Sequence, residues 1–385
     1  MSGSRRILIV AGEASGDRHA AGLMREARTL DPSLSFIGIG GAEMRAAGLE
    51  GIFDGESIAV VGFAEVLTHL PRLRCAFNAC RRVLREGVEA VVLVDYPGFN
   101  LRLARHASAA GVPVLYFICP QVWAWKPGRI EGIARDVDRM LVVLPFEADL
   151  FRGRGIEVEY VGHPLVDAVR PGAPPEETAR RIGIDRSRPV LGILPGSRRS
   201  EIARNLPPAL GAARLLRRSF PGLQVLVPAA PSVGAAVIER GLGSFADVGA
   251  IVTPEPFYDV LSICHAAIVA SGTATLETAL IGVPMVVIYR LNPVTAAVAR
   301  RVTTVRTFGL VNIIAGERIV PECIQEECTP DRIAAAIDIY LRDPSRRAAT
   351  VEALGRVRER LGEGGAYGRA AASLIEFLAR RRPAR

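Results

Sequence analysis

Short apolar runs alternate with segments of helical periodicity along most of the chain, and this alternation constrains the fold most strongly. Strands that alternate with helices are typical of βαβ units, in which the strands run parallel. In the first half the expected strands are Arg6–Val10, Ser35–Ile39, Ala90–Val94, Val114–Ile118, Met140–Val143 and Val158–Val161. In the second half they are Val190–Leu194, Val225–Val227, Ala250–Val252, Ala266–Ala270 and Met285–Tyr289. The pattern predicts an α/β protein with two parallel sheets.

A proline-rich stretch near residues 167–178 separates the two sets of strands and is typical of an exposed linker. We therefore expect two Rossmann-like domains, 1–168 and 180–343, that face a cleft, because such folds bind ligands beyond the carboxyl ends of their strands. Three helices are expected at the end of the chain: Asp331–Leu341, Ser345–Arg360 and Tyr367–Arg381. We expect residues 344–385 to pack on the first domain or on a partner subunit.

Composition excludes several classes of protein. The formal net charge is +8, but Lys126 is the only lysine and aromatic residues make up 6%. A surface that binds nucleic acid would interleave basic with aromatic residues, so no nucleic-acid partner is expected. The six cysteines form no CxxC pair, and no histidine or cysteine cluster has metal-ligand spacing. No apolar run approaches the roughly 20 residues that span a bilayer, which predicts a cytoplasmic protein.

The first candidate for anion binding follows the expected strand Val190–Leu194. Gly196 and Ser197 form a turn before a helix that begins near Ser200, with Glu201 in its first turn. Helix N-termini attract anions, and the Arg198 guanidinium can form paired hydrogen bonds with phosphate oxygens. The alternative is an ordinary strand-to-helix turn with solvated arginines. Because Arg199 doubles the cation, which of the two arginines faces a diphosphate stays open.

A second loop of this kind follows Ala266–Ala270. Ser271, Gly272 and Thr273 offer backbone N–H groups and hydroxyls to a diphosphate at the start of another helix. Glu277, one turn into that helix, can accept hydrogen bonds from ribose hydroxyls. The alternative is a capping-box glutamate that reaches back to the helix start.

The first half carries a loop rich in small and acidic residues directly after its first strand. Its members are Gly12, Glu13, Ala14, Ser15, Gly16, Asp17, Arg18 and His19. Its glycines have the spacing G-x-x-x-G, and the run Gly38–Gly41 follows the wrong strand for a dinucleotide fingerprint. A nicotinamide-dependent oxidoreductase is therefore disfavoured.

Asp95 directly follows the expected strand Ala90–Val94, so its carboxylate should project beyond the end of the sheet. Such a position raises the pKa of a carboxyl group and suits it to general-base catalysis. The alternative is an aspartate that caps the helix near Phe99. Asp136 and Asp138 form an Asp-x-Asp pattern at the opposite end of a strand, and we interpret them as a solvated turn.

Several of these motifs, in this order, resemble those of the lipid-A-disaccharide synthases. They are Gly12–Asp17, Gln121–Trp125, Leu194–Arg198 with Glu201, Ala270–Ala274 with Glu277, Pro284–Arg290, Asn312 and Gln325–Cys328. The resemblance implies a type-B glycosyltransferase fold and an inverting transfer without metal or other cofactor. The donor would be UDP-2,3-diacylglucosamine and the acceptor 2,3-diacylglucosamine 1-phosphate, which form the β-1,6 lipid A disaccharide 1-phosphate and UDP.

The resemblance and the motifs together assign roles. Asp95 and Arg198 are expected to be catalytic, with Glu13 and Asp17 as the alternatives to Asp95 for the base. The donor-binding residues are expected to be Gly196, Ser197, Arg198, Glu201, Ser271, Gly272, Thr273, Glu277, Asn312 and Gln325. The acceptor-binding residues are expected to be Gly12, Glu13, Ser15, Gly16, Asp17 and Trp123.

The resemblance also implies a homodimer, whose C-terminal helices exchange between subunits, and peripheral attachment to the inner membrane. A candidate membrane segment contains Phe63, Val66 and Leu67 and is followed by arginines such as Arg72 and Arg74. Apolar side chains beside arginines suit an anionic membrane surface. The alternative is a packed core helix.

Two other functions fit the same motifs. A UDP-N-acetylglucosamine 2-epimerase would use the fold and the donor pocket without an acylated acceptor. A non-enzymatic nucleotide-sugar binding protein would bind UDP without turnover.

Overall fold

The structure is a computed structural model that describes residues 5–55, 63–120, 122–123, 127–229, 233–292 and 307–380, with the side chains of 63–69 and 127 left out. The chain divides into two compact units. Unit 1 comprises Met1–Pro164 together with Glu363–Arg385, and unit 2 comprises Leu165–Gly362.

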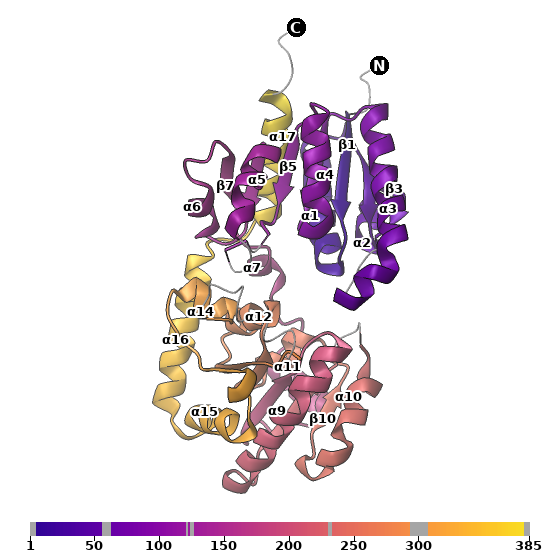
Figure 1. The fold of residues 1–385 in the computed structure, drawn as a ribbon. Helices are drawn as coiled ribbons and strands as arrows, with labels where there is room; N and C mark the ends of the chain where they lie inside the picture. Colours follow the sequence, from indigo (N-terminus) through magenta and orange to yellow (C-terminus); the bar gives the residue numbers. More distant parts are fainter. Residues whose placement is uncertain are drawn as a thin grey trace. The chain divides into compact units, whose positions relative to one another are not determined.

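Unit 1 is built on a seven-stranded parallel sheet (Figure 1). Its strands, in sheet order, are β3 (Leu49–Asp54), β2 (Leu34–Gly40), β1 (Arg5–Ala11), β4 (Ala90–Val94), β5 (Val114–Phe117), β6 (Arg139–Val142) and β7 (Glu157–Tyr160). The order changes direction between β1 and β4, and an α/β sheet of this kind binds its ligands beyond the carboxyl ends of the strands at that point. Asp95 lies there, directly after β4.

Helices cover the sheet of unit 1. They are α1 (Ala14–Leu30), α2 (Ala42–Ala46), α3 (Phe63–Glu86), α4 (Pro97–Ala109), α5 (Ile130–Asp136), α6 (Glu147–Phe151) and α17 (Ala366–Arg380), with a 3-10 turn η2 (Pro127–Arg129). One core joins α3, α4 and α5 to the central strands through fully buried side chains such as Cys80, Leu103 and Tyr116. Burial of this apolar surface is the main driving force that holds the layers together.

The last helix, α17, packs against α1, so a segment from the end of the chain completes the first unit (Figure 1). Gly22 permits the approach, because a Cβ atom there would lie 2.8 Å from the ring of Tyr367. The hydroxyl of Tyr367 lies 2.9 Å from Nδ1 of His19. Arg369 donates to the backbone carbonyls of Val161 and Glu363, at 2.9 and 3.0 Å. It therefore ties together the segments on which the chain leaves and re-enters unit 1.

Unit 2 is built on a six-stranded parallel sheet. Its strands, in sheet order, are β10 (Ile251–Thr253), β9 (Gln224–Pro228), β8 (Val190–Leu194), β11 (Ala266–Ala270), β12 (Met285–Tyr289) and β13 (Glu322–Ile324). Here the order changes direction between β8 and β11. The two loops predicted to bind a diphosphate follow these two strands.

The helices of unit 2 follow its strands. They are α7 (Leu165–Ala168), α8 (Pro175–Ile182), α9 (Arg199–Ser219), α10 (Ala235–Leu242), α11 (Phe257–Ser262), α12 (Thr273–Ile281), α14 (Leu310–Ala315), α15 (Pro330–Arg342) and α16 (Pro344–Arg360), with 3-10 turns η3 (Gly243–Val248) and η4 (Gln325–Glu327). Helices α15 and α16 each begin with a proline. Thr329 caps α15 and Asp343 caps α16. A capping residue followed by proline is a sequence signal for the start of a helix.

The stretch at 167–178, predicted to be an exposed linker, lies within unit 2 and contains the end of α7 and the start of α8; several of its residues, such as Arg170, Pro171 and Gly172, are exposed. The buried carboxylate of Asp259 holds it by accepting hydrogen bonds from the backbone N–H groups of Gly172 (2.5 Å) and Ala173 (3.3 Å). The boundary between the units therefore lies after Pro164.

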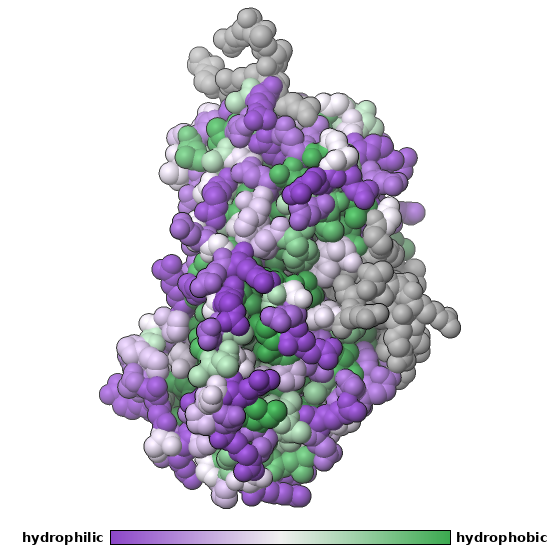
Figure 2. All heavy atoms as spheres, turned by 90° about the vertical axis from the view of Figure 1, so that its left-hand side faces the viewer, coloured by the Kyte–Doolittle hydropathy of each residue, from purple (hydrophilic) through white to green (hydrophobic). Residues whose placement is uncertain are grey.

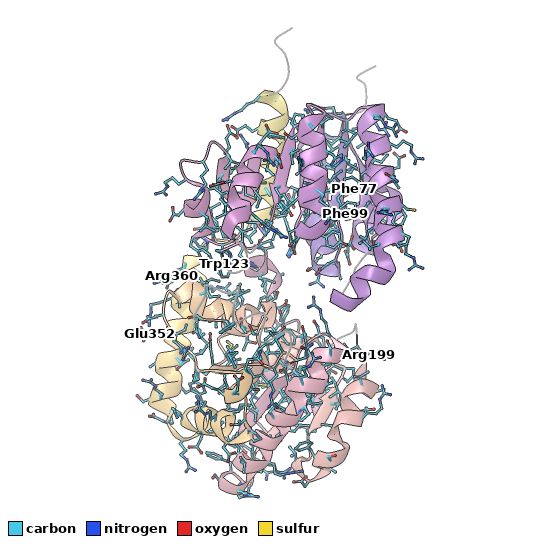
Figure 3. The ribbon with its side chains drawn as sticks, in the orientation of Figure 1. Phe77, Phe99, Trp123, Arg199, Glu352 and Arg360 are labelled. Carbon is cyan, nitrogen blue, oxygen red and sulfur yellow. The ribbon has the colours of Figure 1, made fainter. Side chains whose placement is uncertain are left out.

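The division also differs from expectation at the end of the chain. Helix α16 packs on α12, α14 and α15 of unit 2, and only residues from Glu363 onward belong to unit 1. Arg360, labelled in Figure 3, anchors α16 by donating to the carbonyl of Ile314 at 2.9 Å. Residues 344–385 therefore do not form one segment: α16 and α17 serve different units.

Hydrophilic side chains are spread over the surface in Figure 2, with apolar side chains between them. Many of the charged groups form exposed ion pairs, such as Glu352 with Arg356 (2.8 Å) and Arg342 with Asp338 (2.6 Å). Such pairs each contribute little to stability. In the described part of the chain, no helix is both long enough and apolar enough to span a bilayer.

Candidate active site

Asp95 lies at the end of β4 in an unusual backbone conformation. Asp95 and Tyr96 both have left-handed φ angles, +46° and +51°, and α4 begins at Pro97. Non-glycine residues in this region each cost about 1–3 kcal/mol, and such strain gathers at functional sites. The surrounding structure must therefore hold this turn in place.

Two buried side chains hold it. Nδ2 of Asn100 and the hydroxyl of Tyr116 both donate to the backbone carbonyl of Asp95, at 2.7 and 2.5 Å. Both residues are fully buried. The Asp95 N–H donates to the carbonyl of Phe117 at 3.1 Å, which extends the pairing of β4 with β5. The main chain of Asp95 is thus fixed on both sides.

Burial raises the pKa of the Asp95 carboxyl to about 6, and the negative charge of Glu13 adds to the shift, while a hydrogen bond with the Tyr96 backbone opposes it. A carboxyl group with this pKa is a suitable general base near neutral pH. The alternative of a helix cap is not supported, because the cap position of α4 is Tyr96 and makes no side-chain cap bond.

The residues of the loop after β1 have different surroundings. Glu13 is the cap residue of α1 and lies close enough to Asp95 to raise its pKa, and Ser15 is exposed in the first turn of that helix. Gly12 permits a close approach of the Tyr96 ring, which would lie 2.3 Å from a Cβ there, whereas a Cβ on Gly16 would make only an ordinary contact with Ala11, at 3.5 Å.

Asp17 has a structural role at the start of α2. Its buried carboxylate accepts hydrogen bonds from the backbone N–H groups of Gly41 (2.6 Å), Glu43 (3.0 Å) and Met44 (3.2 Å), and so caps α2. A carboxylate used in this way stabilises the fold. The predicted roles of Asp17 as an alternative base and as an acceptor ligand stay predictions.

Glu147 is a residue that the sequence analysis missed. It is 1% exposed at the start of α6, and burial raises its pKa to about 7, with the charge of Asp95 as a smaller cause in the same direction. Its carboxyl accepts from Nε1 of Trp123 at 3.3 Å and from the N–H of Leu144 at 3.2 Å. Trp123 (Figure 3) also packs edge-on against Phe146, with ring centroids 5.3 Å apart. No sequence motif distinguishes this glutamate from the exposed ones.

The predicted membrane segment lies at the start of α3. The side chains of Phe63, Val66 and Leu67 are outside the part that the structure describes. Further along α3, Leu70 is 40% exposed, and Phe77 packs edge-on against Phe99 of α4 (Figure 3), with centroids 5.6 Å apart. The second half of the helix is therefore a packed core helix.

In unit 2 the loop after β8 is held by Glu201. Its carboxylate accepts from the N–H of Ser197 at 3.2 Å, and Nη1 of Arg198 lies 3.5 Å from its other oxygen. Gly196 has a φ of +122°, and a Cβ there would lie 2.6 Å from Glu201. Glu201 thus orders the loop, and its direct contact with the donor stays a prediction. Arg198 and Arg199 are both exposed at the start of α9, and Arg199 is labelled in Figure 3.

The loop after β11 presents Gly272 and Thr273 to solvent at the start of α12. The φ of Gly272 is +150°, and no atom lies within 4 Å of a Cβ built there, so a ligand can approach the backbone closely. Ser271, in contrast, has hydrogen-bond partners within the protein. Its hydroxyl donates to the carbonyl of Phe308 at 2.8 Å and its N–H donates to that of Ile288 at 2.9 Å. Both of its donors are thus used within the protein.

Buried side chains fix the backbone segment that Ser271 contacts. Asn312 is 1% exposed; it donates to the carbonyl of Val320 and to Glu322, each at 2.9 Å, and accepts from the N–H of Val320 at 3.0 Å. Glu322 in turn accepts from the N–H groups of Phe308 and Gly309. Asn312 therefore has a structural role in unit 2, and its contact with the donor stays a prediction.

Two further amides act similarly. Gln325 adopts a left-handed φ of +54° and accepts from the N–H of Leu291 at 3.3 Å. Asn205 is fully buried between the carbonyl of Pro195 (3.1 Å) and the N–H of Arg290 (3.0 Å). Asn205 thereby links the first diphosphate loop to the end of β12.

Asp136 is the last residue of α5 and Asp138 directly precedes β6, and both are half-buried, so they differ from the solvated turn that was predicted. Asp136 pairs with Arg135 at 2.7 Å, and Asp138 accepts from the N–H of Val114 at 2.8 Å. Within the described ranges, no group of three histidine, cysteine or acidic side chains could hold a metal ion.

Two Rossmann-like units, one with a half-buried carboxyl after β4 and the other with exposed loops after β8 and β11, define the class of the protein: the type-B fold, which glycosyltransferases share with UDP-sugar epimerases. A calicheamicin glycosyltransferase is 18% identical with a TM-score of 0.62, and the match covers 100% of both chains. A UDP-N-acetylglucosamine 2-epimerase from Neisseria meningitidis is 12% identical with a TM-score of 0.61 and covers 98% of this chain and 100% of its own. At these identities the likenesses show the fold alone.

Sequence comparison decides between the transferase and the epimerase. The model of the lipid-A-disaccharide synthetase family matches residues 7–374, so the chain belongs to that family. The lipid-A-disaccharide synthase of Geobacter metallireducens is 48% identical over 98% of this chain and 99% of its own length. That of Myxococcus xanthus is 43% identical over 98% and 99%. The chain is thus a glycosyltransferase, and the epimerase and the non-enzymatic binding protein are excluded.

Proposed function

We propose that the protein transfers 2,3-diacylglucosamine from its UDP derivative to the 6-hydroxyl of 2,3-diacylglucosamine 1-phosphate, with inversion at the anomeric carbon. The products are the β-1,6 lipid A disaccharide 1-phosphate and UDP. Family membership supports the substrates. The observation that carries the mechanism is Asp95, a carboxyl with a raised pKa in a strained turn that two buried side chains hold.

In this proposal Asp95 takes the proton of the acceptor hydroxyl while the oxygen forms its bond to the anomeric carbon. The bond between that carbon and the diphosphate oxygen breaks, and UDP leaves with the electron pair. The N–H groups at the start of α12 and the guanidinium of Arg198 stabilise the charge that develops on the diphosphate. Glu13, Ser15 and Trp123 position the acceptor sugar.

Mass spectrometry of the products tests the reaction. With diacylated UDP-glucosamine and its 1-phosphate counterpart we expect UDP and a tetra-acyl disaccharide phosphate in equal amounts. The matched control is Asp95→Asn, which keeps the shape of the side chain and removes the base. Release of UDP with a free monosaccharide, or binding of UDP without any product, would contradict the proposal.

We also propose that the transfer needs neither a metal nor another cofactor, because cationic and backbone groups can stabilise the leaving diphosphate instead. Arg198 and the start of α12 supply such groups. Transfer by protein treated with EDTA should therefore proceed at the untreated rate. A loss of activity that Mg²⁺ restores would overturn this part of the proposal.

Peripheral attachment to the cytoplasmic face of the inner membrane is the proposed means of reaching acylated substrates. Arg72, Arg74, Arg81 and Arg82 are exposed on α3, downstream of its apolar start. Arginines attract anionic headgroups while apolar side chains enter the acyl layer.

Vesicle sedimentation tests the attachment. The double variant Phe63→Ser/Leu67→Ser should bind less to anionic vesicles and have a higher apparent KM for a long-chain acceptor. The matched control is Leu30→Ser, because Leu30 is 55% exposed at the end of α1. Unfolding of the double variant would identify the segment as core, and unchanged sedimentation would place the membrane contact elsewhere.

A homodimer is the proposed assembly, because the family resemblance implies one. Sedimentation equilibrium should then give a mass near twice the 41.2 kDa of the chain. A monomer at micromolar concentration would overturn the proposal. Exchange of C-terminal helices can be tested with a disulfide between α1 and α17: an exchanged dimer would be covalently linked, and a chain that keeps its own helix would not.

A further inference from the structure

Glu277 has a partner that the sequence did not indicate. Its Oε1 accepts a hydrogen bond of 2.8 Å from the hydroxyl of Tyr258, a residue of α11, 19 positions earlier in the chain. Both side chains are half-buried, and α11 packs on α12. The partner of Glu277 is thus a tyrosine on a neighbouring helix, whereas a capping-box glutamate would bond within its own helix.

Tyr258 stands on a firmly anchored element. Its neighbours Asp259, Val260 and Leu261 are all buried, and Asp259 is bonded to the backbone at Gly172 and Ala173. The ring of Tyr258 also contacts Phe257, with centroids 5.4 Å apart. A hydroxyl carried by such an element has a fixed position, and its hydrogen bond restricts the three torsions of the glutamate side chain.

We propose that Tyr258 is a positioning residue that holds the Glu277 carboxylate for recognition of the ribose hydroxyls of the nucleotide. This inference rests on the proposed UDP-sugar donor. A carboxylate has about four acceptor positions, so accepting a hydrogen bond from a tyrosine is compatible with accepting others from ribose hydroxyls. Ordering the carboxylate before the ligand arrives reduces the entropy cost of binding. Tyr258 therefore acts on the ribose through Glu277.

Nucleotides with and without ribose hydroxyls test the proposal. Calorimetry gives the Kd of UDP and of 2′,3′-dideoxy-UDP for the wild type, Tyr258→Phe and Glu277→Ala. Tyr258→Phe should weaken the binding of UDP about 5- to 10-fold, within the range for one typical intramolecular hydrogen bond, and leave the binding of dideoxy-UDP unchanged. The ratio of the Kd of dideoxy-UDP to the Kd of UDP should thus fall toward the ratio measured for Glu277→Ala. In turnover, the donor KM should rise more than kcat falls.

Tyr340→Phe is the matched control, because it removes a tyrosine hydroxyl from a buried site on α15 of the same unit. It should leave the ratio of the two constants unchanged. Equal weakening of both nucleotides by Tyr258→Phe would show a merely structural role, and no change in either would show no role; both overturn the inference. If wild type fails to bind UDP, or Glu277→Ala leaves the ratio unchanged, the donor assignment itself fails.

Discussion

The two units achieve reactivity in opposite ways. In unit 1 the ionisable groups are withdrawn from water, and burial raises the pKa of Asp95 to about 6 and that of Glu147 to about 7. In unit 2 the loops present exposed groups, such as Arg198 and Gly272, while buried amides such as Asn312 hold the backbone from behind. A site that moves a proton needs a carboxyl with a shifted pKa, whereas a site that binds a diphosphate needs ordered N–H donors.

Asp95→Asn is the most severe test of this contrast. Loss of the base should reduce the rate of transfer roughly 10³- to 10⁴-fold, toward the upper end of what general-base catalysis contributes. Affinity for UDP should stay near that of the wild type, because the donor loops belong to unit 2. Steady-state rates and calorimetry with UDP measure the two effects. A parallel fall in UDP affinity would show that Asp95 acts on the donor.

Arg198→Ala removes charge stabilisation from unit 2 and should have the next largest effect. We expect the rate to fall by about 10²- to 10³-fold, as for the loss of one preorganised donor. Arg199→Ala is the control, because its side chain is exposed one residue further along. If the control loses more activity than Arg198→Ala, the assignment of the two arginines is reversed.

The pH profile tests the shifted carboxyl of unit 1 in the unmodified protein. Asp95 accepts a proton only when it is ionised, so kcat/KM should rise about tenfold per pH unit below the pKa of about 6 and level off above it. Glu13→Gln removes a negative charge that raises this pKa, so the midpoint should move to lower pH. A wild-type midpoint near 4 would mean that the carboxyl is solvated.

Asn312→Ala tests the buried hydrogen bonds of unit 2 and should lower the free energy of unfolding of that unit. It leaves buried groups of Val320 and Glu322 without their partner, at a cost of about 2–3 kcal/mol. The Tm should fall by roughly 4–12 °C for a domain of this size, with or without UDP. Thermal unfolding measures the change, and the exposed Arg198→Ala is the control. An inactive variant with an unchanged Tm would favour the predicted role of Asn312 in donor binding instead.

The sequence predicted those parts of the fold and site that depend on local pattern. The apolar runs of β4 and β11 are fully buried strands with the predicted bounds, and Asp95 follows β4 as expected. The edge strands β3 and β13 were missed, because neither has a continuous apolar run.

The roles of individual side chains could not be predicted where they depend on residues elsewhere in the chain. The sequence could suggest that Asp17 and Asn312 matter, but their roles depend on backbone groups 24 and 8 residues away. Glu147 acquires its raised pKa only when the fold buries it beside Trp123. Long-range contacts of this kind leave no mark on local spacing.

The packing of α17 on α1 has a consequence for the order of synthesis. Unit 1 begins at the first strand of the chain, yet its last helix is translated only after the whole of unit 2. At roughly 5–20 residues per second, the ribosome needs about 10–40 s to make the intervening segment. During that time the surface of α1 that receives Tyr367 is uncovered in the nascent chain. Unit 2 can therefore complete its core before unit 1, although unit 1 emerges first.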